Sequence, residues 1–168
     1  ATSNRCPGAG VVSYAATAAN NTSILYTLDG TSTSARNSIN PANGDVTYVA
    51  SWSGASTITV TAQGCNGPTV ATHVATTASI LGAPSTPSGP SPICQGSAPT
   101  AYTSSAANAI SYTWSVTGAG NSISGTGTTG TVTWSPSFSG NATVSVVANG
   151  CGGATTGPVN FVVTVNPT

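Results

Sequence analysis

The chain carries the same pattern of residues twice, and this duplication limits its fold more than any other feature. Five stretches of the first half match stretches of the second half at an offset of 84 to 88 residues. The matching stretches are Cys6–Gly8 with Cys94–Gly96, Ile24–Leu28 with Ile110–Trp114, Asn37–Ile39 with Asn121–Ile123, Ser53–Val60 with Ser139–Val146, and Gln63–Gly67 with Asn149–Gly153. A period of this size indicates two modules, each the size of a small domain.

Each copy contains short stretches in which apolar residues alternate with polar ones. In the first copy the alternating positions are Val12, Tyr14 and Ala16, then Ile24, Tyr26 and Leu28, then Val46, Tyr48 and Ala50, then Ile58, Val60 and Ala62. In the second they are Ile110, Tyr112, Trp114 and Val116, then Val132 and Trp134, then Val144, Val146 and Ala148, then Val159, Phe161, Val163 and Val165. Strands at this spacing, separated by turn residues and with no helical periodicity, predict an all-β chain of two tandem antiparallel sandwiches.

The duplication also suggests where the modules begin and end. We expect a first domain over residues 1–83, a linker over residues 84–92 and a second domain over residues 93–168. The linker is rich in Pro, Ser and Gly. Prolines at this density favour an extended polyproline conformation, which predicts a semi-rigid spacer.

The four cysteines predict disulfides and an oxidising, extracellular location. They form no Cys-x-x-Cys pair and have no set of histidines beside them, which argues against a zinc site. Cys6 and Cys94 occupy equivalent positions before the first strand of each copy, and Cys65 and Cys151 both follow a late strand rich in Thr and Val. The duplication therefore predicts one bridge within each domain, Cys6–Cys65 and Cys94–Cys151.

Charged side chains are almost absent. The chain has two Lys or Arg, two Asp or Glu and one His, so that charged residues make up 2% of it. Ordinary domains carry roughly a quarter. Two arginines cannot form an electrostatic footprint for nucleic acid, and we expect neither a metal site nor a cofactor. No apolar run is long enough to cross a membrane.

His73 is the one candidate base. It lies in an alternating stretch, and we expect it on the solvent face of a strand rather than in a catalytic site.

Low charge also removes the repulsion that keeps proteins apart, which favours self-association. Two kinds of candidate site remain. Trp52 is a candidate sugar-stacking residue, although the core is the favoured place for all three tryptophans because Trp114 and Trp134 align with Leu28 and Tyr48. Asn20, Asn21 and Asn141 each begin an Asn-x-Ser/Thr sequence and are candidate glycosylation sites.

The chain resembles PKD-like and immunoglobulin-like modules. The residues that carry the resemblance are Cys-x-Gly, Tyr-Thr-Trp-Ser-Val-Thr-Gly over 112–118, Ser-Gly-Asn-Ala-Thr-Val-Ser-Val over 139–146 and Asn-Gly-Cys-Gly over 149–152. Such modules are repeated in tandem in large secreted surface proteins of Bacteroidota-type bacteria, including adhesins. The acidic turn of true PKD domains is replaced by uncharged residues here, so calcium binding does not follow from the resemblance.

These features together predict a non-catalytic structural protein. We expect a repeat unit of an extracellular filament, stalk or sheath, formed by self-association or tandem repetition, with the chain itself as partner and with glycans as a covalent addition. The alternative is an adhesin or carbohydrate-binding module. Ice binding, suggested by Thr in alternate positions of 57–61, is the weakest of the three hypotheses. The first residues do not resemble a signal peptide, and we expect the sequence to be a segment of a longer protein.

Overall fold

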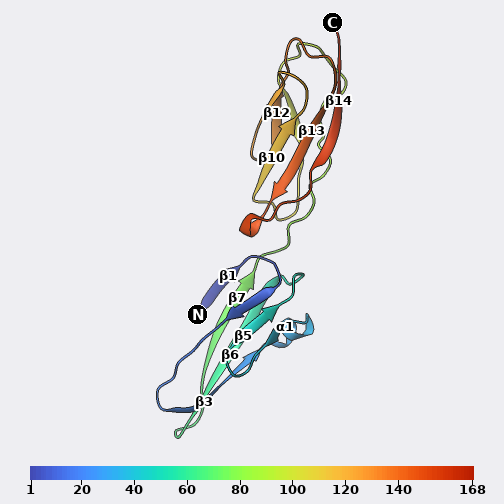
Figure 1. The fold of residues 1–168 in the computed structure, drawn as a ribbon. Coiled ribbons are helices and arrows are strands. Elements are labelled where there is room, and N and C mark those ends of the chain that lie inside the picture. Colours follow the sequence, from blue (N-terminus) through green and yellow to red (C-terminus); the bar gives the residue numbers. More distant parts are fainter. The chain divides into compact units, whose positions relative to one another are not determined.

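The structure, a computed structural model, describes all 168 residues and divides into two compact units, Ala1–Ile80 and Leu81–Thr168 (Figure 1). Each unit is built almost entirely from β-strands. No helix in either unit is long and apolar enough to cross a membrane.

The first unit contains two sheets. One has the strand order β1-β7-β6-β3 and the other the order β2-β5-β4. The elements are β1 (Thr2–Arg5), β2 (Gly10–Ser13), β3 (Asn21–Leu28), the short helix α1 (Gly30–Ser34), β4 (Ser38–Ile39), β5 (Asp45–Tyr48), β6 (Gly54–Gly64) and β7 (Thr69–Thr77). All pairs are antiparallel except β1 with β7, which are parallel.

The second unit repeats this arrangement strand for strand. Its sheets have the orders β10-β13-β14-β8 and β11-β12-β9, and its one parallel pair is β8 with β14. The elements are β8 (Ile93–Cys94), β9 (Thr100–Thr103), β10 (Ser111–Val116), β11 (Ser122–Ser124), β12 (Thr129–Thr133), β13 (Gly140–Asn149), the 3-10 turn η1 (Cys151–Gly153) and β14 (Val159–Asn166). The sequence duplication is therefore a duplication of structure.

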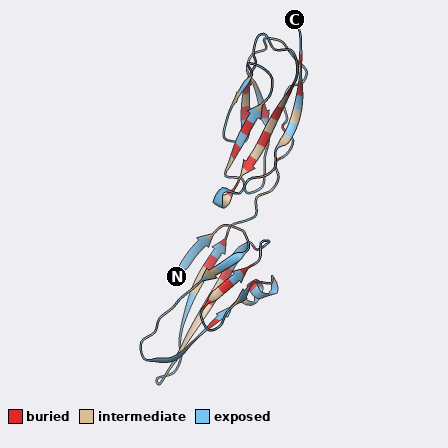
Figure 2. Ribbon diagram, in the orientation of Figure 1, coloured by how far each residue is buried: buried red, intermediate tan, exposed pale blue.

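Side chains from both sheets of each unit form its core (Figure 2). In the second unit twelve buried apolar residues make one cluster, whereas the first unit has six. All three tryptophans belong to these cores, as expected. The predicted alternation is confirmed at most positions, with the inward side chains of β13, Ala142, Val144, Val146 and Ala148, wholly buried. The first unit has the less complete core, and its cavities are described below.

Two equivalent asparagines show how closely the loops of the units correspond. The Asn37 side-chain oxygen accepts a hydrogen bond from the backbone N–H of Val49 at 2.9 Å. The Asn121 oxygen accepts one from Ser135 N–H at the same distance. Each asparagine thus ties one loop of its unit to another.

Candidate docking groove in the first unit

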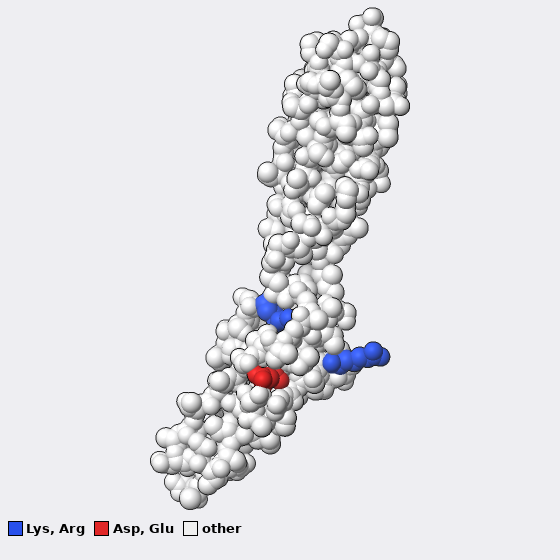
Figure 3. Space-filling view, in the orientation of Figure 1, with Lys and Arg blue, Asp and Glu red and all other residues white.

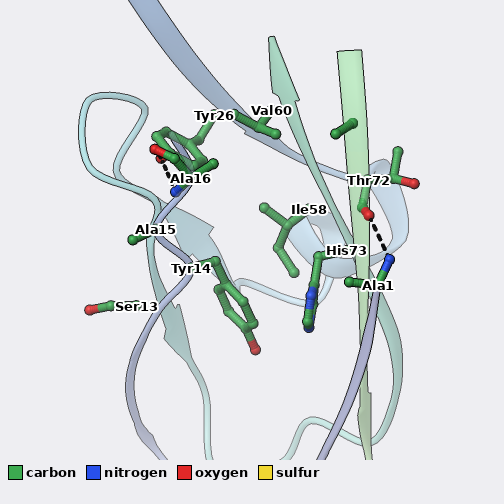
Figure 4. Close-up of a pocket in the computed structure, with 11 residues that line it drawn as sticks. Ala1, Ser13, Tyr14, Ala15, Ala16, Tyr26, Ile58, Val60, Thr72 and His73 are labelled. Carbon is green, nitrogen blue, oxygen red and sulfur yellow. Dashed lines mark hydrogen bonds between the residues drawn. The ribbon is translucent and has the colours of Figure 1, made fainter. Parts of the chain in front are cut away.

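A groove of about 380 Å³ opens along one side of the first sandwich (Figure 4). It runs between the segment that follows β2 and the inward side of β6 and β7. Its walls are mostly apolar or aromatic, and the residues that shape it are Tyr14, Tyr26, Ile58, Val60, Ala71 and His73. A smaller cavity of about 110 Å³, lined by Ala16, Ala18, Ala62 and Ala71 among others, lies on the same side of the unit.

The groove is held in shape by tyrosines. The Tyr26 hydroxyl accepts a hydrogen bond from Ala16 N–H at 2.9 Å, which fixes the segment after β2. The hydroxyl oxygens of Tyr14 and Tyr48 lie 3.2 Å apart. Gly44 allows this packing, because a Cβ there would lie 2.5 Å from the Tyr14 carbonyl oxygen and 2.8 Å from the Tyr26 ring, and its φ is +77°. Only glycine fits such a position without displacing its neighbours.

His73 faces the groove rather than the solvent, so the predicted orientation is wrong. Its ring centroid lies 5.0 Å from that of Tyr14, and its Nε2 lies 2.7 Å from the Ser3 hydroxyl oxygen. The expectation failed because the register of β6 and β7 pairs His73 with Ile58, whose side chain is buried, so the imidazole lies on the same inward face of the sheet. A catalytic triad needs an acid that orients the base, and the partners of His73 include no carboxylate.

The two carboxylates have other partners. Asp29 caps α1: its Oδ1 accepts from Ser32 N–H at 2.8 Å and its Oδ2 from Thr57 N–H at 2.7 Å. Burial raises the pKa of Asp29, but the hydrogen bonds from Ser32 and Thr57 outweigh this effect and lower the pKa below its ordinary value. Asp45 accepts from the Ser13 hydroxyl and from the Asn43 amide. Both carboxylates are therefore used in holding loops.

The cations are likewise held by structural contacts or exposed. The Arg5 guanidinium donates to the Gly8 carbonyl at 2.8 Å and to the Thr77 hydroxyl at 3.2 Å, and it lies 4.0 Å from the centre of the Tyr48 ring. This geometry is a cation–π contact. Arg36 is exposed and has a positive φ of 71°. No cluster of three or more His, Cys, Asp or Glu exists that could hold a metal ion.

The corresponding side of the second unit is filled by its own chain. Ser88 and Thr103 exchange backbone hydrogen bonds at 2.9 Å, Ser85 N–H donates to the Ser105 carbonyl and Gly82 N–H donates to the Ala107 carbonyl. Pro84 and Pro87 are buried. The segment predicted as a linker, residues 84–92, is therefore an integral edge of the second unit. Prolines had suggested a spacer, but they are also tolerated at sheet edges, where one side of the backbone needs no partner.

One pair of rings in each unit shows that the open groove of the first unit and the filled side of the second are equivalent. Tyr102 and Phe161 lie with their ring centroids 6.0 Å apart in the second unit, as Tyr14 and His73 do in the first. The filled groove thus has Phe where the open groove has His.

Neither predicted disulfide is present. Cys65 and Cys94 are free and exposed, whereas Cys6 and Cys151 are disulfide-bonded. One cysteine of each equivalent pair is therefore bonded and the other is free.

Strand register explains the error in the first unit. Cys6 follows β1, whose last residue pairs with Thr77, and Thr77 pairs with Gly54 at the start of β6. Cys65 follows Gly64 at the other end of β6. Ten steps along a strand of about 3.3 Å per residue separate the two ends by about 33 Å. A disulfide needs Cα atoms about 4.4–6.8 Å apart.

The same geometry holds in the second unit. Cys94 lies beside the end of β14, where Val165 pairs with Gly140, the first residue of β13. Cys151 comes just after Asn149, the last residue of that strand. Each unit therefore has a cysteine at each end of its longest strand. The duplication shows which cysteines of the two copies are equivalent, but it does not show how far apart the two cysteines of one unit lie.

The remaining predicted sites lie apart from the groove. Trp52 is buried, with 8% of its surface exposed, so it offers no face on which a sugar could stack. Asn20, Asn21 and Asn141 are exposed. Asn21 donates to the Ala18 carbonyl and Asn141 accepts from the Thr164 hydroxyl. The groove itself was missed because its signal, the four alanines among residues 15–19, indicates only a weak strand.

The second unit matches a known family. Residues 81–161 match the family model of the PKD-like domain. No curated protein sequence matches the chain.

A three-domain immunoglobulin fragment of titin in a Glu-to-Ala variant has a similar structure. It is 9% identical at a TM-score of 0.52, over 99% of this chain and 62% of that one. An I-band fragment of titin is 11% identical at a TM-score of 0.50, over 98% and 62%. Fibronectin(III)-like modules of Clostridium thermocellum CbhA are 13% identical at a TM-score of 0.43, over 99% and 90%. At these identities the likeness concerns the fold, which is that of immunoglobulin-like β-sandwiches.

Proposed function

We propose that this chain is a structural, non-catalytic repeat unit of an extracellular filament, stalk or sheath, in which modules associate with further copies of themselves. The observation that carries the proposal is the distribution of charge. All four charged side chains lie in the first unit, and the second has none. Figure 3 shows the charged atoms on the first unit only. A charge-free module cannot repel its neighbours electrostatically, so close packing of many copies meets no such penalty.

The outer face of the β10-β13-β14 sheet supports this function. It presents hydroxyl and amide groups that already bond to one another across strands. Asn149 Nδ2 donates to the Thr113 hydroxyl at 3.0 Å, and the Thr164 hydroxyl donates to Asn141 Oδ1 at 3.2 Å. A face of this kind can meet a similar face through hydrogen bonds without burying a charge.

Electron microscopy and light scattering of the purified chain over a range of concentrations test the proposal. We expect assemblies that grow with concentration. Thr113→Lys with Thr164→Lys should weaken assembly at low salt and recover it at high salt, because added salt screens the new charges. The matched control is the double substitution of the same residues by Ala. A wild-type chain that stays monomeric at every concentration would contradict the proposal.

A carbohydrate-binding or adhesive role is the second candidate. The observation in its favour is the open groove with the Tyr14, Tyr26 and His73 rings, since aromatic rings and a few polar groups are what sugar sites use. A glycan array with the wild-type chain and Tyr14→Ala tests it. Binding that the substitution abolishes would favour this function over the structural one.

We further propose that glycans add to the hydration of the surface. Asn20, Asn21 and Asn141 are the candidate acceptors, and their side chains are accessible. Peptide mass mapping of material from the native source decides this: unmodified masses for the peptides that contain Asn20, Asn21 and Asn141 would rule it out.

A further inference from the structure

Two buried hydrogen-bond donors of the first unit have no acceptor in the protein. They are Nδ2 of the Asn37 amide and Nε1 of the Trp52 indole. Only 3% of Asn37 and 8% of Trp52 is exposed, so bulk solvent does not supply the missing acceptors. Nearly all buried polar groups in proteins are paired, because leaving one unpaired is unfavourable. We propose that the first unit holds an internal water molecule whose oxygen accepts hydrogen bonds from both Asn37 Nδ2 and Trp52 Nε1.

Backbone contacts bring the two side chains to the same corner of the sandwich. Val49 N–H donates to Asn37 Oδ1 at 2.9 Å, and the Val49 carbonyl accepts from Trp52 N–H at 3.2 Å. The first of these bonds also fixes the orientation of the amide, because only its oxygen can accept. The unpaired atom of Asn37 is therefore its donor nitrogen.

The second unit shows which acceptor the asparagine would otherwise use. Asn121 is the equivalent residue, and its Oδ1 accepts from Ser135 N–H at 2.9 Å. Its Nδ2 donates to the Thr117 carbonyl at 3.1 Å. The amide of Asn121 is thus paired at both ends, whereas that of Asn37 is paired at one.

The second unit also shows that the aromatic ring lies beside this amide. Phe138 stands where the first unit has Trp52, and its N–H donates to the Ser135 carbonyl at 3.1 Å. A Cβ on Gly118 would lie 2.4 Å from Asn121 Nδ2 and 2.7 Å from the Phe138 ring, so the amide and the ring are neighbours. The ring of Phe138 has no polar hydrogen. The first unit therefore has one more donor at this corner and one acceptor fewer.

The helix α1 accounts for the missing acceptor. Asp29 corresponds to Thr117, because each exchanges hydrogen bonds with the equivalent strand residue, Thr57 or Thr143. In the first unit α1 lies between this position and the asparagine. The Asp29 carbonyl accepts from Thr33 N–H at 3.1 Å and from the Thr33 hydroxyl at 3.2 Å. A carbonyl has two lone pairs, so α1 has taken the acceptor that the amide uses in the second unit.

Water is the ligand that matches these two donors. Less than 1 Å² of either donor atom is accessible, so only a very small molecule fits beside them. A water oxygen accepts two hydrogen bonds, and internal waters in proteins bond to buried groups that are otherwise unpaired. A chloride ion could also accept from both, but burying an ion costs far more than burying a neutral molecule.

Water-selective NOE and ROE spectra of the isotope-labelled full chain test the proposal. We expect cross-peaks to water at the Trp52 indole N–H and at the Asn37 side-chain amide. The cross-peaks should have opposite signs in the two spectra, because an internal water tumbles with the protein. Trp114 is the control within the chain. Its Nε1 donates to the Gly127 carbonyl at 3.0 Å, so its indole N–H should show no such cross-peak.

Trp52→Phe tests whether the two donors share one water. The substitution removes Nε1 and introduces the residue that the second unit has at this position. The water then has one donor instead of two, so the Asn37 side-chain amide should exchange with solvent about tenfold faster and its water cross-peaks should weaken. The matched control is Trp114→Phe, which removes an indole N–H that has a protein acceptor and should leave the Asn37 signals unchanged.

Four results would overturn the proposal. They are no water cross-peak at either donor, an equal cross-peak at Trp114, unchanged Asn37 signals in Trp52→Phe, and donor shifts that follow chloride concentration at constant ionic strength. The last would identify a halide in place of water. If Trp52→Phe does not fold, the wild-type spectra decide, because they need no variant. The corner lies within one unit, so assembly of the chain has no bearing on these results.

Discussion

Asp29 is the carboxylate on which the first unit depends most, and Asp29→Ala should destabilise that unit by about 3 kcal/mol. The substitution removes a helix cap, worth about 1 kcal/mol. It also removes an ionised acceptor from Thr57 N–H at 2.7 Å and from the buried Ser32 hydroxyl at 2.8 Å. Hydrogen bonds to charged groups contribute about 1.5–3 kcal/mol each and are not additive here. For a domain of this size the melting temperature should fall by roughly 12–24 °C.

Calorimetry measures this fall, and hydrogen exchange in β3 and β6 assigns it to the first unit. Because the pKa of Asp29 is lowered in the folded state, its stabilising effect is present above the unfolded pKa, near 3.8, and is lost as the pH falls through the folded value. The difference between wild type and variant should therefore shrink below about pH 4. The matched control is Asp45→Ala, which removes a turn carboxylate at a cost below about 1 kcal/mol. Equal effects of the two substitutions would refute the reasoning.

Three further predictions concern the cores. Burial raises the pKa of both Tyr48 and Tyr102. Their contribution to the free energy of unfolding should therefore be fully present below about pH 10 and should fall as the pH rises above it, which alkaline unfolding curves will measure. Gly130→Ala places a Cβ 2.5 Å from the Trp114 ring and should cost about 1–3 kcal/mol in urea unfolding. Val146→Ala, at a wholly buried position, should cost about 2 kcal/mol in the same assay, and a change under 0.5 kcal/mol would contradict the core packing described.

The sequence was sufficient for most of the strand pattern. Alternation identified the inward residues of β13 because apolar residues occupy every second position from 142 to 148, with Thr143 and Ser145 between the first three of them. Alignment of the copies also placed Trp134 in the core, since a residue aligned with Tyr48 has to fill the same space. These features depend on local pattern, which periodicity reports directly.

Other features depend on which surfaces meet, and local pattern does not report them. Residues 84–92 read as a spacer because proline density describes the conformation of a segment and not its contacts. In the structure Pro87 is buried and Ser88 pairs with Thr103, so the segment belongs to the second unit rather than to a spacer. His73 was misplaced for a related reason: the side of β7 that it faces is set by pairing with β1 and β6.

The cysteines show that a sequence duplication alone does not determine disulfide pairing. Equivalence states only that Cys6 resembles Cys94 and that Cys65 resembles Cys151, and it fits bridges within a module and bridges between modules equally well. The length of β6 distinguishes the two, because an eleven-residue strand holds its ends about 33 Å apart. A module with one cysteine at each end of such a strand cannot close a bridge on itself while folded.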